Sequence, residues 1–251
     1  MVDAWRLSVG TLTALRVGHP SVVDRHVAGH AMLLAPFAVV PLGVLVGLIG
    51  WGGRELELAP LAVAAVAVLA LALGSRALHL DGLSDVADAL TASYDRQRSL
   101  EVMKGGTSGP AGSAALVLVL GVQVAALASV LSLPRGPVLA ALLVCASRAI
   151  LAVTCVRGVP AASGNGLAAT YAGTVSRSLA VLTWIVVAAL CSCVADWSGL
   201  DWWQGLAVVA AGVVVGSALT WRCVRRFGGV TGDVFGASIE VTLAAMLLAA
   251  T

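Results

Sequence analysis

Long apolar stretches separated by short polar segments organise most of the chain. A helix that crosses a membrane needs about 20 mostly apolar residues, and seven stretches reach or approach this length. The pattern therefore predicts an all-α fold, a polytopic integral membrane helix bundle of about seven transmembrane helices within a range of six to eight. The predicted spans cover approximately residues 31–50, 58–78, 111–133, 137–156, 179–194, 203–221 and 234–250.

Composition agrees with a membrane protein. The 251 residues are 59% hydrophobic and only 11% charged, whereas soluble domains carry about 25% charged residues. Because so few charged groups cannot cover a globular surface in water, the chain needs the bilayer as its solvent. One membrane-embedded domain over residues 1–251 accounts for the whole length. The net charge of +2 is too small to indicate a nucleic-acid partner.

The segment 1–30 precedes the first predicted span and has no continuous apolar core. Trp5, Leu7, Leu12 and Leu15 could form one side of a helix that lies on the membrane surface. A loosely ordered tail is the alternative, and the sequence leaves both open.

The basic residues fall mainly on one set of alternate polar segments. Twelve of the 15 Lys and Arg residues lie before the first span or in the segments after the second, fourth and sixth spans. Only Arg54 and Arg135 lie on the opposite side, and Arg148 lies inside the fourth span. Because cytoplasmic loops are enriched in Lys and Arg, we predict a plasma-membrane protein with a cytoplasmic N-terminus and an active site that faces the cytoplasm.

The polar segment after the second span begins with an acidic run. Asp81, Asp85 and Asp88 are spaced i, i+4, i+7, so on a helix they share one face, which Asp95 would continue if the helix persisted. Carboxylates stacked in this way repel one another, and Mg²⁺ relieves that repulsion because it takes hard oxygen ligands. We therefore predict that these three Asp residues bind Mg²⁺. The alternative is a solvated helix start, where Asp residues favour the positive end of the helix dipole.

Further polar residues follow the acidic run. Arg96, Arg98, Glu101 and Lys104 precede the glycine-rich turn 105–112. A turn that leads into a helix offers free N–H groups to phosphate, and basic side chains beside an acidic metal site suit a diphosphate. Glycine and proline also simply punctuate loops, so the turn alone is weak evidence.

A second polar segment, residues 228–233, leads into the last predicted span, and we call it the second polar island. Thr231 and Asp233 belong to it, and Glu240 lies on the same helix face as Asp233, inside the apolar stretch. Ionisable residues within a membrane mark functional sites by default, and this applies to Arg148 as well. Asp233 could instead be an ordinary N-cap. Arg148 could pair with Glu240, either as a structural ion pair or as part of a site that binds phosphate.

Three motifs together resemble those of the cobalamin synthase family, the adenosylcobinamide-GDP ribazoletransferases. The family patterns read approximately HLDGLADTADG, then Leu-Glu-x-Met-Lys, then GGLTGDVLGAxIE. The chain matches them with HLDGLSDVAD at 79–88, LEVMK at 100–104 and GGVTGDVFGASIE at 228–240. It departs from the family at 105–107, where Gly-Gly-Thr replaces residues that often carry charge, and at Ala89, where Gly is common.

The resemblance implies one membrane-embedded catalytic domain, Mg²⁺ as the metal, and the substrates adenosylcobinamide-GDP and α-ribazole or its 5′-phosphate. A ribazole hydroxyl would attack the cobinamide-linked phosphate and release GMP. On this interpretation Asp81 and Asp85 hold Mg²⁺, and Asp88 completes the metal site or accepts the hydroxyl proton. The remaining predicted site residues contact substrate: Lys104 with Arg96 or Arg98 neutralises phosphate charge, Asp233 and Glu240 form the opposite wall, and Glu101, Arg148 and Thr231 line the site.

Two other functions remain as alternatives. A CDP-alcohol phosphotransferase also uses Asp-rich membrane helices and Mg²⁺, but its pattern requires an Ala-Arg pair shortly after Asp-Gly, which this chain lacks. A secondary transporter would place its ionisable residues near mid-membrane, whereas most acidic residues here lie at a predicted membrane edge. Membrane lipid is the expected surrounding, and a homo-oligomer remains possible.

Overall fold

The structure is a computed structural model that describes residues 1–251. It consists of fourteen helices without a β-strand, which confirms the predicted all-α class. The helices are α1 (Val2–Leu12), α2 (Arg25–Leu33), α3 (Ala35–Ala38), α4 (Val40–Glu55), α5 (Pro60–Gly74), α6 (Leu78–Ala92), α7 (Arg96–Met103), α8 (Pro110–Ser132), α9 (Gly136–Ser147), α10 (Ile150–Thr154), α11 (Leu167–Tyr171), α12 (Arg177–Trp197), α13 (Trp202–Phe227) and α14 (Gly232–Ala249).

Five segments are long and apolar enough to cross a membrane. They are α8, the α9–α10 pair over Gly136–Thr154, α12, α13 and α14, and they coincide with the last five predicted spans. The first two predicted spans correspond to shorter helices, because α4 has 16 residues and α5 has 15. A sixth span results if α5 and α6 are taken together. The structure thus confirms a polytopic helical membrane protein, while the number of spans and the side of each end stay predictions.

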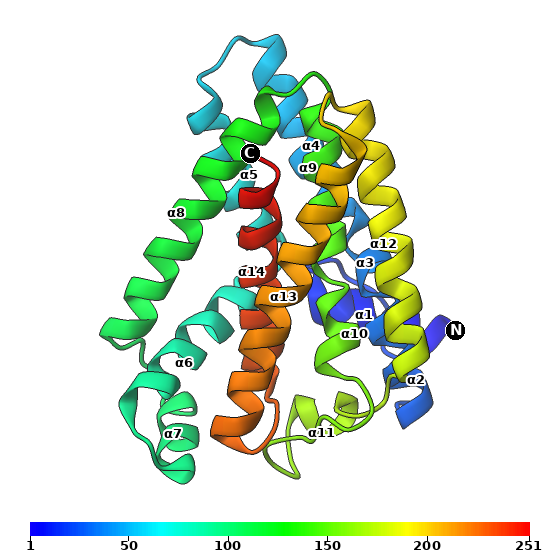
Figure 1. Cartoon of the computed structure of the whole chain (residues 1–251). Helices are drawn as coiled ribbons and strands as arrows, with labels where there is room; N and C mark the ends of the chain where they lie inside the picture. The colour runs from blue at the N-terminus through cyan, green and yellow to red at the C-terminus, as the bar shows by residue number, and fades with distance from the viewer.

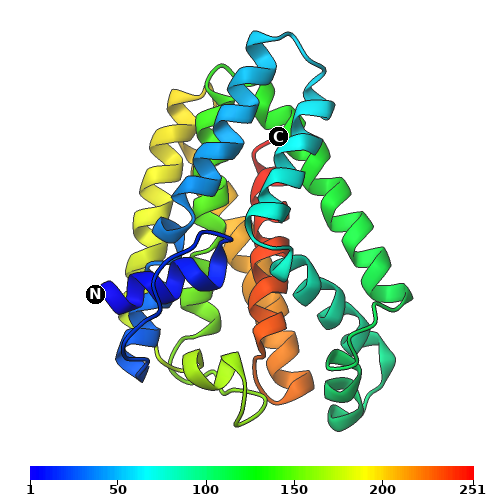
Figure 2. The same cartoon turned by 180° about the vertical axis from the view of Figure 1, so that it is seen from behind.

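The long helices surround α14. Figures 1 and 2 show α14 in the middle of the bundle, with α8 on one side and α12 on the other. α14 packs against α13, α6, α8, α9 and α10, and most of its residues are buried. The connections α6–α7–α8, α10–α11–α12 and α13–α14 all lie at one end of the bundle (Figure 1). This arrangement agrees with the expectation that the long polar loops share one side.

A sharp bend of 91° separates α5 from α6. The amide of Ala77 donates to the oxygen of Ala72, and the amide of Arg76 donates to the oxygen of Leu73. This pair of bonds is a Schellman motif, which ends a helix through a residue of left-handed conformation, usually glycine. Here the residue is Arg76, with φ of 58°. α6 therefore leaves the direction of α5, and we treat it as lying outside the spanning segments.

The N-terminal helix α1 lies across the long helices, as Figure 2 shows. Ala4, Ser8, Val9 and Leu12 are buried, whereas Trp5 is exposed. Residues 2–12 are therefore not a loose tail. Of the residues predicted to face the membrane, Leu12 packs on the protein and Trp5 is exposed. The position of α1 on a membrane surface stays a prediction.

Candidate active site

Two glycines bring α6 and α14 into direct backbone contact. A Cβ atom at Gly82 would lie 2.6 Å from the backbone oxygen of Asp233 and 2.9 Å from its Cα. A Cβ atom at Gly236 would lie 2.9 Å from the Cα of His79. Because only glycine permits this approach, the acidic run and the second polar island meet at the crossing. The structure thus places the backbone of Asp233 beside the acidic run, while a role of Asp233 in the site stays a prediction.

A cavity of about 360 Å³ opens at this crossing. Asp81 and Asp233 line it, together with His79 and Arg76. Residues of α1, α2, α10, α11 and α14 supply the apolar part of the wall: Leu12, Met32, Leu151, Leu167, Phe235 and Ile239. An apolar pocket with a few convergent polar groups is the usual form of a small-molecule site. We call it the carboxylate cavity.

Negative charge accumulates at the rim of the carboxylate cavity. Burial, followed by the negative charges of Asp81 and Asp233, raises the pKa of Asp85 to about 6. None of these three carboxylates forms an ion pair with a basic side chain. No three acidic, His or Cys side chains converge on one point as a preformed metal cage. A cation that binds here would therefore draw some of its ligands from water or substrate.

Asp88 is directed away from the carboxylate cavity. Its two oxygens accept hydrogen bonds from the amides of Gly109 at 2.6 Å and Gly112 at 2.9 Å. Its side chain is buried, and nearby the hydroxyls of Ser84 and Ser108 lie 2.8 Å apart. Asp88 thus holds the glycine-rich turn at the start of α8. This corrects the expectation that these two amides are free for phosphate. The charge of Asp88 still contributes to the raised pKa of Asp85, and the metal role of Asp88 stays a prediction.

The row of acidic residues on α6 does not extend to Asp95, although the helical spacing would permit it. α6 stops at Ala92, and Asp95 instead caps α7 by accepting a hydrogen bond from the amide of Arg98 at 2.8 Å. Along α6 the acids turn progressively into the protein, because Asp81 is exposed, Asp85 is half-buried and Asp88 is buried. The helix passes beneath the start of α8, which covers its C-terminal half.

The basic residues of α7 lie outside the carboxylate cavity. Arg96 donates to the backbone oxygen of Ala162 at 2.9 Å, and Arg98 pairs with Glu101 at 3.4 Å on the surface. Lys104 is exposed, and with Arg96 and Glu101 it lines a separate depression. Arg76, which the sequence analysis used only for orientation, is the basic residue that reaches the carboxylate cavity.

Thr231 and Asp233 have different roles at the start of α14. Thr231 is the N-cap, since its hydroxyl accepts a hydrogen bond from the amide of Val234. The same hydroxyl lies 3.2 Å from Asp233 and 3.3 Å from the sulfur of Met103, the last residue of α7. Asp233 is therefore not the N-cap, and its carboxylate remains available at the cavity wall.

Glu240 lies deeper in the protein, beside His79. Gln123 donates to a carboxylate oxygen of Glu240 at 2.7 Å and to its backbone oxygen at 3.1 Å, while the Nδ1 atom of His79 lies 3.6 Å from the other carboxylate oxygen. Arg148 does not pair with Glu240. Its Nη1 donates to the oxygens of Val144 and Ser147, each at 2.8 Å.

His79 and Gln123 are site residues that the sequence analysis did not select. The one available signal for Gln123 was an amide side chain inside the apolar stretch 111–133. For His79 the signal was its position two residues before Asp81, at the start of the acidic motif. Neither signal specifies Glu240 as the partner, because the three residues come from three different helices.

Comparison with known proteins gives matches over nearly the whole chain. Residues 4–251 match the sequence model of the cobalamin-5-phosphate synthase family. An adenosylcobinamide-GDP ribazoletransferase of Nocardioides sp. (strain ATCC BAA-499 / JS614) is 53% identical over 249 residues, which cover 99% of this chain and 98% of that protein. Enzymes of the same name from Frankia casuarinae and Pseudomonas paraeruginosa are 37% and 35% identical, over 99% and 95% of this chain and 94% and 93% of their own lengths. No solved structure matches the chain.

Proposed function

Because the chain belongs to the cobalamin-5-phosphate synthase family, we propose that it joins α-ribazole, or α-ribazole 5′-phosphate, to adenosylcobinamide-GDP. The observation that supports this most directly is the meeting of Asp81, Asp85 and Asp233 at the α6–α14 crossing, beside a largely apolar cavity. A hydroxyl of the ribazole attacks the cobinamide-linked phosphorus. The bond from that phosphorus to the GMP oxygen breaks, and the hydroxyl proton is released.

Asp81 and Asp85, with Asp233 in place of Asp88, are the proposed Mg²⁺ ligands. Their chemistry fits, because Mg²⁺ usually binds one or two carboxylates together with substrate phosphates and water. Three acids without a basic partner are unfavourable until a cation joins them. The bound ion would neutralise the charge that develops on the phosphate oxygens.

Arg76 is the proposed partner of the diphosphate. It lines the carboxylate cavity, and its guanidinium donates to the backbone oxygen of Gly10 at 2.7 Å, which holds it beneath α1. A guanidinium carries five N–H donors, so further donors remain for phosphate. Arg96 and Arg98 are already engaged by Ala162 and Glu101. We assign Lys104, which lies outside the cavity in a separate depression, to the nucleotide end of the substrate, which extends beyond the cavity.

His79 and Glu240 keep the cavity wall in place. The bonds from Gln123 fix the carboxylate of Glu240, and this carboxylate in turn lies beside His79 on the crossing helix. We propose that this buried set orients α6 against α14, and that Arg148 supports α9 through its bonds to Val144 and Ser147 without contacting substrate.

The site lies at the end of the bundle that gathers the long polar connections (Figure 1). The charge distribution supports the proposal that this end faces the cytoplasm, where nucleotide substrates are available. The apolar helices support a location in a membrane, and we propose that this is the plasma membrane. Membership of the family favours this transfer over both a CDP-alcohol phosphotransferase and a transporter.

The decisive experiment measures GMP and cobalamin formation by the purified chain from adenosylcobinamide-GDP and α-ribazole, with increasing Mg²⁺. Asp85→Asn should lose on the order of 100-fold in rate, since even residues that only support metal ligands cost about 10- to 100-fold. Asp95→Asn is the matched control: it removes the same charge on the neighbouring helix and leaves an N-cap residue in place. Near-normal GMP release by Asp85→Asn at saturating Mg²⁺ would disprove the metal role. Failure of the wild-type chain to release GMP, with solute uptake by vesicles instead, would reverse the functional assignment.

A further inference from the structure

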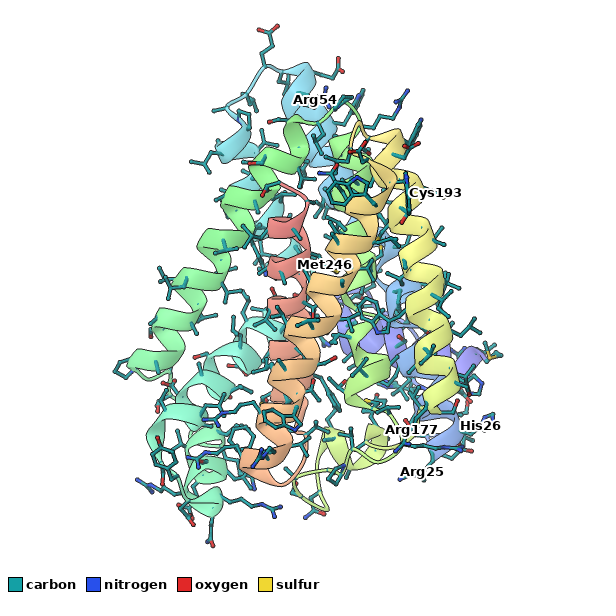
Figure 3. The ribbon with its side chains drawn as sticks, in the orientation of Figure 1. Arg25, His26, Arg54, Arg177, Cys193 and Met246 are labelled. Carbon is teal, nitrogen blue, oxygen red and sulfur yellow. The ribbon has the colours of Figure 1, made fainter.

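Three arginines from separate segments converge on one surface region. Arg25 is the first residue of α2, Arg157 lies in the connection between α10 and α11, and Arg177 is the first residue of α12. Two adjoining depressions of about 460 and 440 Å³ share Arg157 and Gly158 in their walls. We call them together the arginine hollow. Figure 3 shows Arg25 and Arg177 at the same end of the bundle, with Arg54 at the opposite end.

The arginine hollow contains no counter-charge. No acidic residue lines either depression, and none of the three arginines has a carboxylate partner within 4.0 Å. The nearest acid in sequence, Asp24, is occupied as the N-cap of α2 by the amide of Val27 at 2.7 Å. Uncompensated guanidinium groups repel one another, so the region favours an anion.

The backbone folds to hold these guanidinium groups close. Arg25 donates to the backbone oxygens of Ala172 and Gly173, each at 3.3 Å. The Nη2 atom of Arg177 would lie 3.4 Å from a Cβ atom at Gly158, whose φ is +107°. Arg157 and Arg177 themselves make no side-chain hydrogen bond to the protein. Their donors are therefore available to a ligand.

An apolar helix face begins directly beside the hollow. Leu179, Leu182, Ile185 and Val186 follow Arg177 on α12 and are between 42% and 60% exposed. From Leu179 to Leu190 the face runs about 16 Å at 1.5 Å per residue. Half of a bilayer's hydrocarbon core measures about 15 Å. The hollow and the face thus have the dimensions and polarity of one lipid leaflet, with the charge at the headgroup end.

We propose that the arginine hollow binds the headgroup of an anionic phospholipid. The phosphodiester oxygens accept hydrogen bonds from Arg157 and Arg177, the hydroxyl of Ser178 faces the headgroup, and an acyl chain lies along α12. This site is separate from the carboxylate cavity. α11 stands between them, since Leu167 lines the cavity while Ala169 and Ala172 line the hollow.

Bound lipid would connect the α10–α11 segment to α12. That segment also meets the α13–α14 connection, where the amide of Ala162 donates to Val230 and the amide of Val230 donates to Pro160. The lipid would therefore stabilise the α13–α14 connection, which leads to Asp233. A free phosphate compound is the competing occupant, and the apolar face continuous with the hollow favours lipid.

Titration of phosphatidylglycerol into the delipidated full chain in detergent, followed by native mass spectrometry, tests the proposal. The variant Arg157→Gln/Arg177→Gln removes the two free arginines. Arg16→Gln/Arg222→Gln is the matched control, since both residues are exposed, basic and predicted to lie on the same side. Phosphatidylcholine serves as the neutral lipid, and inorganic phosphate and GMP serve as soluble competitors.

The wild-type chain and the control should bind phosphatidylglycerol more tightly than phosphatidylcholine. Each arginine near a membrane surface changes affinity roughly five-fold, so the double variant should lose roughly 5- to 25-fold. An equal loss in both double variants, or no loss in either, overturns the proposal. Displacement of phosphatidylglycerol by equimolar phosphate or GMP assigns the hollow to a soluble ligand instead. If the double variant does not purify, Arg157→Gln and Arg177→Gln separately, each with a roughly five-fold expected loss, carry the same test.

Discussion

Replacing Asp88 by asparagine separates a structural role of this carboxylate from a role in metal binding. In the structure both oxygens accept charge-assisted hydrogen bonds, from Gly109 at 2.6 Å and Gly112 at 2.9 Å, and the side chain is only 9% exposed. Asparagine keeps one acceptor oxygen and places its NH₂ group against the other amide. Asp88→Asn therefore exchanges two charge-assisted bonds for one neutral bond.

The energy of that exchange follows from typical bond strengths. Hydrogen bonds to charged groups contribute about 1.5–3 kcal/mol each and neutral ones about 0.5–1.5 kcal/mol, so the turn loses about 2.5–4.5 kcal/mol of local stability. At 1.36 kcal/mol per factor of ten, the equilibrium constant for opening of the turn rises roughly 70- to 2000-fold. Hydrogen exchange at the amides of Gly109 and Gly112, measured by mass spectrometry in detergent, should accelerate by that factor.

Asp85→Asn is the comparison that makes the measurement decisive. It should raise the Mg²⁺ concentration needed for half-maximal GMP release and leave exchange at Gly109 and Gly112 unchanged. Asp88→Asn should do the reverse, with altered exchange and an unaltered Mg²⁺ requirement. If Asp88→Asn shifts the Mg²⁺ requirement as strongly as Asp85→Asn and leaves the turn protected, Asp88 is a metal ligand and our interpretation of the turn is wrong.

Three further predictions follow from the cavity. The folded chain holds the Asp85 proton up to about pH 6, above the ordinary Asp value near 3.9, so ionisation destabilises the fold as pH rises through that window. Asp85→Asn should therefore raise Tm in EDTA, and by more at pH 7 than at pH 4.5. Gly82→Ala should cost about 1–3 kcal/mol of stability, because the added methyl group overpacks against Asp233, and both Tm and kcat/KM should fall. Gly121 has open space around it, so the control Gly121→Ala should match wild type. Arg76→Gln should lower kcat/KM for adenosylcobinamide-GDP about 10- to 100-fold by loss of phosphate-charge stabilisation, and an unchanged value in steady-state kinetics would remove Arg76 from the site.

Hydropathy was sufficient to predict the later part of the bundle. Each of the last five predicted spans coincides with a helix or helix pair that can cross a membrane. The reason is physical, since a segment in lipid must satisfy its own backbone hydrogen bonds and a helix does so within one apolar stretch. The pairing of Asp233 with the acidic run was also predictable, because both belong to polar islands at the same predicted membrane edge.

The bend between α5 and α6 was not predictable from residue types. Left-handed helix ends normally carry glycine, but here Arg76 and Ala77 adopt φ of 58° and 55°. Tertiary contact determines the outcome, because the guanidinium of Arg76 bonds to Gly10 of a helix about 65 residues earlier in the chain. The same limit applies to Asp88. Its helical spacing specified a face of α6, but only the fold shows that α8 covers that part of the face.

The contact of Gly82 with Asp233 also bears on how the chain is made. These positions leave the ribosome about 150 residues apart, which at about 5–20 residues per second means a delay of roughly 8 to 30 s. During that interval Asp81 and Asp85 have no facing wall, because α14 has not been synthesised. Because the proposed site includes Asp233, we expect a nascent chain to remain inactive until α14 has been synthesised and inserted.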